Sequence, residues 1–180
     1  MTAPALGTLD WQPALDRPEL LAEPVAATLR RLDLSCFVGA IDPDLADTAA
    51  FCTAYEVPPE AAANCVVVAG RRTGTTTLAA CLVLAIDRAD VNRTVRRRLD
   101  VRSISFAPMA EAVSQTGMAY GGITPVGLPG GWPLLVDDAV AEQEWVVVGS
   151  GIRGSKLALA GSDCARLPAA QVLTLRQPRA

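Results

Sequence analysis

The sequence predicts a mixed α+β fold built on a curved sheet with flanking helices. At 180 residues the chain is long enough for one domain with a substantial core. Short apolar runs with strand character outnumber the segments with helical spacing. The helical segments interrupt these runs irregularly, which argues against a regular βαβ repeat. We therefore expect a single domain over residues 1–180, with residues 1–17 as a loose lead-in.

The first two helices are expected at residues 18–34 and at residues 42 to about 55. The first carries apolar residues at intervals of three or four, namely Leu21, Val25, Leu29 and Leu32. Pro24 either kinks this helix or marks its start. Asp42 followed by Pro43 is typical of an N-cap and the first helical residue.

Two shorter helices and seven strands complete the expected elements. The helices are an arginine-rich one at residues 91–99 and one at residues 110–116, which Gly117 is well placed to end. Strands are expected at residues 36–41, 64–68, 78–87, 134–136, 145–148, 156–160 and 171–175. Residues 70–74 contain two glycines and are typical of a hairpin turn between the second and third of these strands.

Several classes of function are excluded by residues that the chain lacks. It has no histidine, so Ser-His-Asp triads, Cys-His dyads and histidine-ligated metal sites are ruled out. Its five cysteines are widely spaced, without a C-x-x-C pair, and indicate reduced, buried thiols of a cytoplasmic protein. No stretch approaches the roughly 18 apolar residues that cross a bilayer. We expect no metal, no organic cofactor, no membrane partner and no DNA partner; the oligomeric state stays open.

Charge is distributed unevenly along the chain. Residues 1–60 contain ten acidic and three basic residues, whereas residues 61–180 contain nine acidic and thirteen basic residues. Six arginines lie between positions 88 and 102, against two aspartates. The arginines of the expected helix are candidates for binding the phosphates of a polyanionic partner: Arg93, Arg96, Arg97 and Arg98. A solvated helix face is the alternative explanation.

Two glycine-rich turns are the most informative stretches. Residues 120–127 read YGGITPVG, and residues 149–156 read GSGIRGSK, with the only lysine of the chain at position 156. Glycine allows a positive φ and a close approach of a ligand to main-chain N–H groups, while Pro125 stiffens the first turn. We expect the two turns to form the walls of one pocket.

The second turn also matches the G-x-G-x-x-G pattern of dinucleotide-binding folds. Residues 156–159 alternate like a strand rather than opening a helix, and only 26 residues follow the motif. Both observations argue against a dinucleotide site. The order Gly-Ser-Lys excludes a Walker A loop, and a tight β-turn remains the simplest structural alternative.

Taken together, five short segments resemble the YbaK/EbsC family, which includes the editing domain inserted in bacterial prolyl-tRNA synthetases. They are AANCVVV at residues 62–68, TG at 116–117, GGITPVG at 121–127, VD at 136–137 and VGSGIRG at 148–154. The resemblance spans about residues 51–175. It implies a single domain with a mixed, barrel-like sheet and hydrolysis of mischarged aminoacyl-tRNA, with a small amino acid on tRNA-Pro as the typical substrate.

The resemblance also implies site residues at the 3′-terminal adenosine end of the tRNA. It makes the phosphates of the tRNA backbone the expected ligand of Arg93, Arg96, Arg97 and Arg98. The residues assigned to substrate binding are Tyr120, Gly121, Gly122, Ile123, Thr124, Pro125, Val126, Gly127, Asp137, Gly149, Ser150 and Arg153. The residues assigned to catalysis are Lys156, Asn64 and Gly151. An aminoacyl ester is already activated, so a positioned water and main-chain donors to the developing oxyanion can suffice. In this family the ribose hydroxyl of the substrate is expected to replace a protein base.

The chain departs from the family at position 64. Members of the family usually carry a lysine there, whereas this chain has Asn64, which can donate a hydrogen bond but brings no charge. Lys156 stands where the family often has an acid. Two hypotheses follow: a trans-acting deacylase in which the charge has moved from position 64 to position 156, or a domain that binds a nucleotide, an aminoacyl-adenosine or a tRNA 3′ end without hydrolysing it.

Overall fold

The computed structural model describes residues 2–178 and shows a mixed α+β fold with two sheets. The first sheet is antiparallel throughout, in the order β1-β2-β8-β7. Its strands are β1 (Gln12–Pro13), β2 (Phe37–Ala40), β7 (Val146–Gly149) and β8 (Ser155–Leu159). All five side chains of β8 are buried, because this strand lies between two neighbours and beneath the helices.

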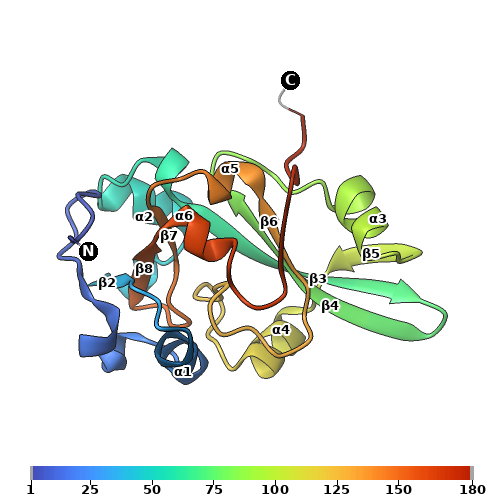
Figure 1. The fold of residues 1–180 in the computed structure, drawn as a ribbon, viewed down its shortest axis with the longest axis horizontal. Helices are drawn as coiled ribbons and strands as arrows, with labels where there is room; N and C mark the ends of the chain where they lie inside the picture. Colours follow the sequence, from blue (N-terminus) through green and yellow to red (C-terminus); the bar gives the residue numbers. More distant parts are fainter. Residues whose placement is uncertain (1, 179–180) are drawn as a thin grey trace.

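The second sheet has the order β5-β3-β4-β6-β9 and mixes strand directions. Its strands are β3 (Ala63–Arg72), β4 (Thr75–Leu84), β5 (Ser103–Phe106), β6 (Leu134–Asp137) and β9 (Ala170–Leu173). The β3–β4 hairpin turns tightly at Thr73 and Gly74, which both have positive φ, and it extends beyond the rest of the fold with β5 beside it (Figure 1). The other pairs, β4–β6 and β6–β9, are parallel.

The two sheets meet at β3 but leave a gap there. On the side away from β4, a single bridge joins Ala62, just before β3, to Val147 of β7, and pairing with β5 begins only at Val68. Two sheets therefore replace the one barrel-like sheet expected from the sequence. Residues 64–66 of β3 form an open edge between β7 and β5, and this edge positions the site described below.

Within residues 2–178, six short α-helices surround the sheets. They are α1 (Glu23–Leu32), α2 (Thr48–Ala54), α3 (Arg96–Arg98), α4 (Met109–Thr116), α5 (Asp138–Ala141) and α6 (Gly161–Cys164). Pro24 lies in the first turn of α1, so it marks the start of this helix and does not kink it. Gly117 ends α4 in a left-handed conformation, as expected.

Two of the expected helices differ in detail. The segment from Asp42 to Tyr55 is two helices, because Asp42 caps a 3-10 turn at Pro43–Leu45 and Asp47 then caps α2. The arginine-rich helix begins as one π-helical turn at Val91–Val95 and continues as α3.

The N-terminal segment is packed onto the fold and is not a loose lead-in. β1 pairs with β2, the side chains of Trp11 and Ala14 are buried, and the Trp11 indole N–H donates to the carbonyl of Leu6 at 2.9 Å. The largest apolar cluster lies under α1 and joins both sheets, with Val25, Leu82 and Leu157 among its members. Within residues 2–178, no helix is long and apolar enough to cross a membrane.

Candidate active site

The open edge of β3 lies in the wall of a cavity of about 520 Å³. The two glycine-rich turns lie opposite, as the sequence predicts for the walls of one pocket. Both contribute to the lining: Tyr120, Gly121 and Ile123 from the first, and Gly149 and Lys156 from the second. The remaining wall comes from the start of α2, from β3 around Asn64, and from the segment that links β5 to α4.

The glycines of the two turns serve mainly to bring the turns together. The Gly151 N–H donates to the carbonyl of Gly122 at 2.7 Å. A Cβ atom on Gly122 would lie 2.5 Å from the carbonyl oxygen of Ile152, and one on Gly149 would lie 2.4 Å from that of Gly122. Side chains at these positions would separate the turns. The expectation that Gly122 makes room for a ligand is therefore wrong; it makes room for the second turn.

Lys156 reaches the cavity from β8 with almost all of its surface buried, at 5 % exposed. Its ammonium donates to the carbonyl of Ala46 at 2.8 Å and lies 5.1 Å from the centre of the Phe51 ring. Burial lowers the pKa of Lys156 below its ordinary value, partly opposed by the neighbouring Cys52 and Asp47. No ion pair of Lys156 is recorded among residues 2–178, so it is a desolvated cation held mainly by uncharged groups.

Asn64 lines the same cavity from β3. Its side-chain oxygen accepts a hydrogen bond from the hydroxyl of Thr48 at 2.6 Å, which fixes the amide against the first turn of α2. Asp47, the cap of α2, also lines the cavity. Asn64 and Lys156 thus come from different sheets and face one space, which allows the exchange of positions inferred from the sequence.

The open edge adds main-chain groups of β3 to the cavity wall. The carbonyl of Ala62 accepts from Ala85 on the β4 side, and the carbonyl of Val67 accepts from Ala107 on the other side. Because alternate residues of a strand direct their N–H and C=O groups to opposite edges, those of Cys65 point away from β4. There β5 has ended, so the Cys65 N–H is a main-chain donor at the cavity.

The remaining residues of the two turns lie behind the cavity wall. Thr124 and Val126 are fully buried, and Gly127 packs against the carbonyl of Pro24. The Ser150 hydroxyl pairs with that of Ser155 at 2.7 Å, and Gly151 packs on Ala22. Four residues assigned to substrate binding and one assigned to catalysis therefore have packing roles: Thr124, Val126, Gly127, Ser150 and Gly151. Pro125 is also buried and does not line the cavity.

Arg153 holds the turns in place. Its guanidinium donates to the carbonyl of Pro43 at 2.8 Å and to that of Tyr120 at 3.3 Å. It is not among the residues that line the cavity. Arg153 therefore connects the 3-10 turn before α2 with both glycine-rich turns and positions the wall that carries Tyr120.

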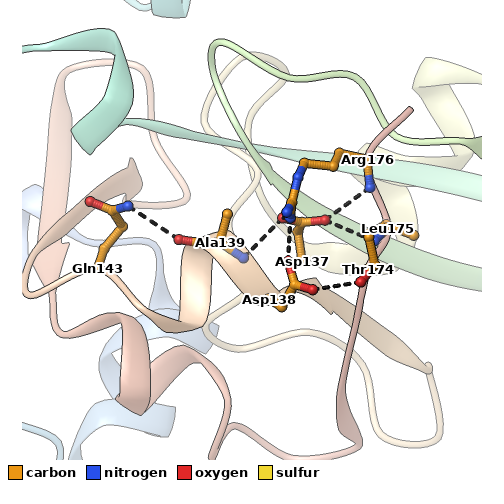
Figure 2. Close-up of polar contacts among 7 residues, drawn as sticks. All are labelled: Asp137, Asp138, Ala139, Gln143, Thr174, Leu175 and Arg176. Carbon is orange, nitrogen blue, oxygen red and sulfur yellow. Dashed lines mark hydrogen bonds and ion pairs between the residues drawn. The ribbon is translucent and has the colours of Figure 1, made fainter. Parts of the chain in front are cut away.

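Asp137 lies elsewhere, where β6 passes into α5 (Figure 2). It is fully buried and accepts four hydrogen bonds: from the N–H groups of Ala139, Leu175 and Arg176, and from the Arg176 guanidinium at 2.6 Å. The neighbouring Asp138 bonds Thr174 and also contacts Arg176, and these contacts lower the pKa of Asp138. This network attaches the C-terminal segment to the second sheet and is separate from the cavity.

The four candidate tRNA-binding arginines are exposed on the segment that leads into and forms α3. No hydrogen bond or ion pair of their side chains is recorded within residues 2–178, so they are free to meet a ligand. The described residues include no group of three or more acids and cysteines that could hold a metal.

The cysteines are free thiols, four of them buried. Burial raises the pKa of Cys36, Cys81 and Cys164 to about 12 and also raises the pKa of Cys52 and Cys65. Cys65, at the cavity, is therefore a neutral thiol and not a nucleophile.

Sequence reasoning missed the rim of the cavity. Phe106, Met109 and Tyr120 line it and are 67 %, 57 % and 61 % exposed, which makes them half of the six large apolar side chains exposed within residues 2–178. Only Tyr120 was expected at the site. An isolated Phe-x-x-Met between a short strand and a helix has no periodic pattern, so only the fold reveals its position.

Solved structures share this fold. A candidate trans-editing enzyme for prolyl tRNA synthetase superposes with a TM-score of 0.73 at 21% identity, over 87% of this chain and 97% of that chain. The hypothetical protein APE2540 superposes with a TM-score of 0.76 at 19% identity, over 86% of this chain and all of that chain. No curated protein matches the chain in sequence.

The sequence model of one family does match. It describes an aminoacyl-tRNA editing domain and covers residues 42–167, which include both glycine-rich turns, the open edge of β3 and Lys156. The chain therefore belongs to the aminoacyl-tRNA editing domain family.

Proposed function

We propose that this protein is an aminoacyl-tRNA deacylase that hydrolyses mischarged tRNA in trans, in the cytoplasm, with a small amino acid on tRNA-Pro as the first substrate to test. One observation carries the proposal: the only lysine of the chain is buried in the wall of the cavity that Asn64 also lines. A desolvated cation costs free energy of folding, so a buried lysine without a recorded ion pair in a cavity wall is a candidate for a functional residue. The structural relative associated with prolyl tRNA synthetase supports the choice of tRNA.

The reaction breaks the ester between the amino acid and the ribose of the terminal adenosine. Water adds to the ester carbonyl, and the carbonyl oxygen becomes negatively charged. The ribose oxygen then leaves and takes up the proton that the water loses. Since the chain has no histidine and its cavity thiol is neutral, we assign proton transfer to the neighbouring ribose hydroxyl of the substrate.

The protein contributes position and charge. The Lys156 ammonium stabilises the developing oxyanion, and its effect is strong because the site is partly shielded from water. The Asn64 amide, oriented by Thr48, and the Cys65 main-chain N–H are further donors to the same oxygen. The first turn, held by Arg153, borders the ribose and adenine.

The alternative is a domain that binds a nucleotide, an aminoacyl-adenosine or a tRNA 3′ end without hydrolysis. Asn64 favours it, because the lysine of the family is missing at this position. The same cavity would serve, and Lys156 would then bind a carbonyl or phosphate oxygen without accelerating a reaction.

A deacylation assay on a panel of mischarged tRNAs tests the proposal. We expect Lys156→Met to lower the rate by about ten- to a thousandfold, equivalent to about 1.4–4 kcal/mol of transition-state stabilisation. Arg166→Ala, at an exposed arginine of the α6 region that does not line the cavity, is the matched control and should react at the parental rate. Asn64→Lys, added to Lys156→Met, should recover part of the loss if either wall can supply the charge.

Two results would contradict parts of this proposal. Parental activity of Lys156→Met would show that the charge does not act from position 156. Failure of the wild-type protein to hydrolyse any member of the panel would favour the binding domain.

A further inference from the structure

A second cavity of about 500 Å³ adjoins the candidate active site along the open edge of β3. The two cavities share Asn64, Val66 and Phe106 in their linings, so they lie directly side by side. Phe106 is the last residue of β5 and lies between them with two thirds of its surface exposed. A chain-like ligand that fills the first cavity can therefore pass over Phe106 into the second.

The second cavity carries polar groups suited to a nucleotide. Arg88, Asn92, Ser105 and Gln177 contribute a cation, amides and a hydroxyl to its wall, alongside the apolar Val91 and Ile104. Asp87 also lies in this wall, but it is buried and already has an interaction with its surroundings. Beyond Arg88 the chain continues into the exposed segment with Arg93, Arg96, Arg97 and Arg98.

Charge distinguishes the second cavity from a third cavity that also adjoins the candidate active site. This third cavity meets the first at Asp47, Thr48 and Asn64. Its only charged lining residue is Asp47, and most of its lining comes from residues 1–60, the acidic part of the chain. Phosphates avoid such a surface and favour arginine. A phosphodiester strand that leaves the first cavity therefore runs toward Arg88.

We propose that the second cavity is a binding site for the nucleotides that precede the terminal adenosine of a single-stranded RNA 3′ end. Unpaired bases stack on exposed aromatic side chains, and the basic groups alongside bind the backbone. Phe106 is the stacking platform between the two cavities, and Arg88 contacts a phosphate. This inference rests on the proposed function, since that function places the terminal adenosine in the first cavity.

Equilibrium binding of an uncharged RNA tests this inference without any chemistry. The probe is a fluorescent hairpin that ends in a single-stranded CCA, and the reference is the same hairpin with a blunt end. We expect Phe106→Ala to weaken binding of the CCA hairpin about 5- to 100-fold, whereas Phe106→Trp keeps it. Val172→Ala, at an exposed apolar residue of β9 outside both cavities, should bind as the wild-type protein does.

The salt dependence of the same binding tests Arg88. Loss of one phosphate contact on a single strand should reduce the slope of log K against log salt by about 0.7 in Arg88→Ala. Arg31→Ala, at an exposed arginine of α1, should leave the slope unchanged. Since all six proteins differ only at exposed positions, their melting temperatures serve to show that each is folded.

The outcomes separate this inference from the proposed function. A protein that hydrolyses no mischarged tRNA but binds the CCA hairpin in a Phe106-dependent way supports the inference and contradicts the deacylase. Active hydrolysis with equal affinities of the wild-type protein and Phe106→Ala for the CCA hairpin overturns the inference alone. Failure of the wild-type protein to prefer the CCA hairpin over the blunt one also overturns it.

Discussion

Asp137 and Lys156 are both buried charged residues, but their surroundings compensate the two charges to different degrees. Asp137 is fully buried and has four hydrogen bonds, one of them within an ion pair with Arg176. Lys156 is nearly as buried, but it has one recorded hydrogen bond, to a main-chain carbonyl, and the face of one aromatic ring. Asp137 lies away from the cavity, whereas Lys156 lines it.

The difference shows how to separate structural from functional charges in this fold. A charge removed from water is tolerated when protein groups replace the lost hydration. For Asp137 the replacement is complete, and the charge fastens the C-terminal segment to β6. For Lys156 the replacement is partial, and the donors left over are available to an oxyanion in the cavity. Both residues had been assigned to the site from the sequence, and their partners and their positions relative to the cavity distinguish them.

The largest effect on stability is expected for Asp137→Ala. It leaves three N–H groups without their acceptor and the Arg176 guanidinium with Asp138 as its remaining partner, so we expect the free energy of unfolding to fall by about 3–5 kcal/mol. Chemical denaturation measures this change. Glu19→Ala is the control, because Glu19 also pairs with an arginine but is exposed, and its loss should change stability little.

A stability loss for Asp137→Ala no larger than for Glu19→Ala would contradict the comparison. It would mean that the network around Asp137 is not needed for folding and that this residue must be considered again for binding.

A smaller loss of stability is expected for Gly122→Val, which tests whether the close packing of the two glycine-rich turns stabilises the fold. The added side chain meets the main chain of Ile152, which cannot move away as a flexible side chain would. Overpacking of this kind costs about 1–3 kcal/mol. Gly130→Val is the matched control in the following loop, since a Cβ at Gly130 meets nothing within 4 Å. Thermal melts of the two variants should differ clearly.

Equal melting of the two glycine variants, together with loss of substrate binding in Gly122→Val alone, would reverse this assignment. Gly122 would then border the ligand rather than the second turn.

Much of the local structure could be predicted from the sequence because it depends on local chemistry. The end of α4 at Gly117 and the strands rich in valine follow from conformational preferences. For Pro24 these preferences left two possibilities, a kink or the start of the helix, and the structure shows the second. The segment after Asp42 was harder, because two successive aspartate caps divide it into two helices where the sequence suggested one. Short elements such as β5, α5 and α6 carry too few residues to show a period.

The site could be predicted only in part, because its decisive contacts join distant residues. The two glycine-rich turns were expected to meet, and they do. Which glycines face the cavity depends on how closely the two turns pack, and the residue types alone do not indicate how closely they pack. The same holds for the burial of Lys156. The alternation of residues 156–159 indicated a strand but not that β8 is covered on both faces, so that every one of its residues is buried.

The smallest effect, and the sharpest test of the comparison, is the pH dependence of stability that Lys156 causes. Replacement of a desolvated charge by an apolar side chain of similar length is often neutral or stabilising. At neutral pH we therefore expect Lys156→Met to be as stable as the wild-type protein or more stable by about 1–2 kcal/mol, despite its lower activity. Urea denaturation of both proteins at a series of pH values measures the difference.

The stability advantage of Lys156→Met over the wild-type protein should shrink as the pH rises toward 10.5. Burial lowers the pKa of Lys156 below the 10.5 that it has when exposed, so between these values the unfolded chain binds more protons than the folded one. In that window the free energy of unfolding of the wild-type protein gains up to about 1.4 kcal/mol per pH unit relative to Lys156→Met. Below the window the penalty is constant. The buried thiols titrate in both proteins, so their contributions to the stability difference cancel. Cys52 is the exception, because it interacts with Lys156, and it should be replaced by serine in both proteins. A difference that grows with pH would mean that the folded protein raises the pKa of Lys156, as a fully compensated ion pair would, and Lys156 would then belong with Asp137 among the structural charges.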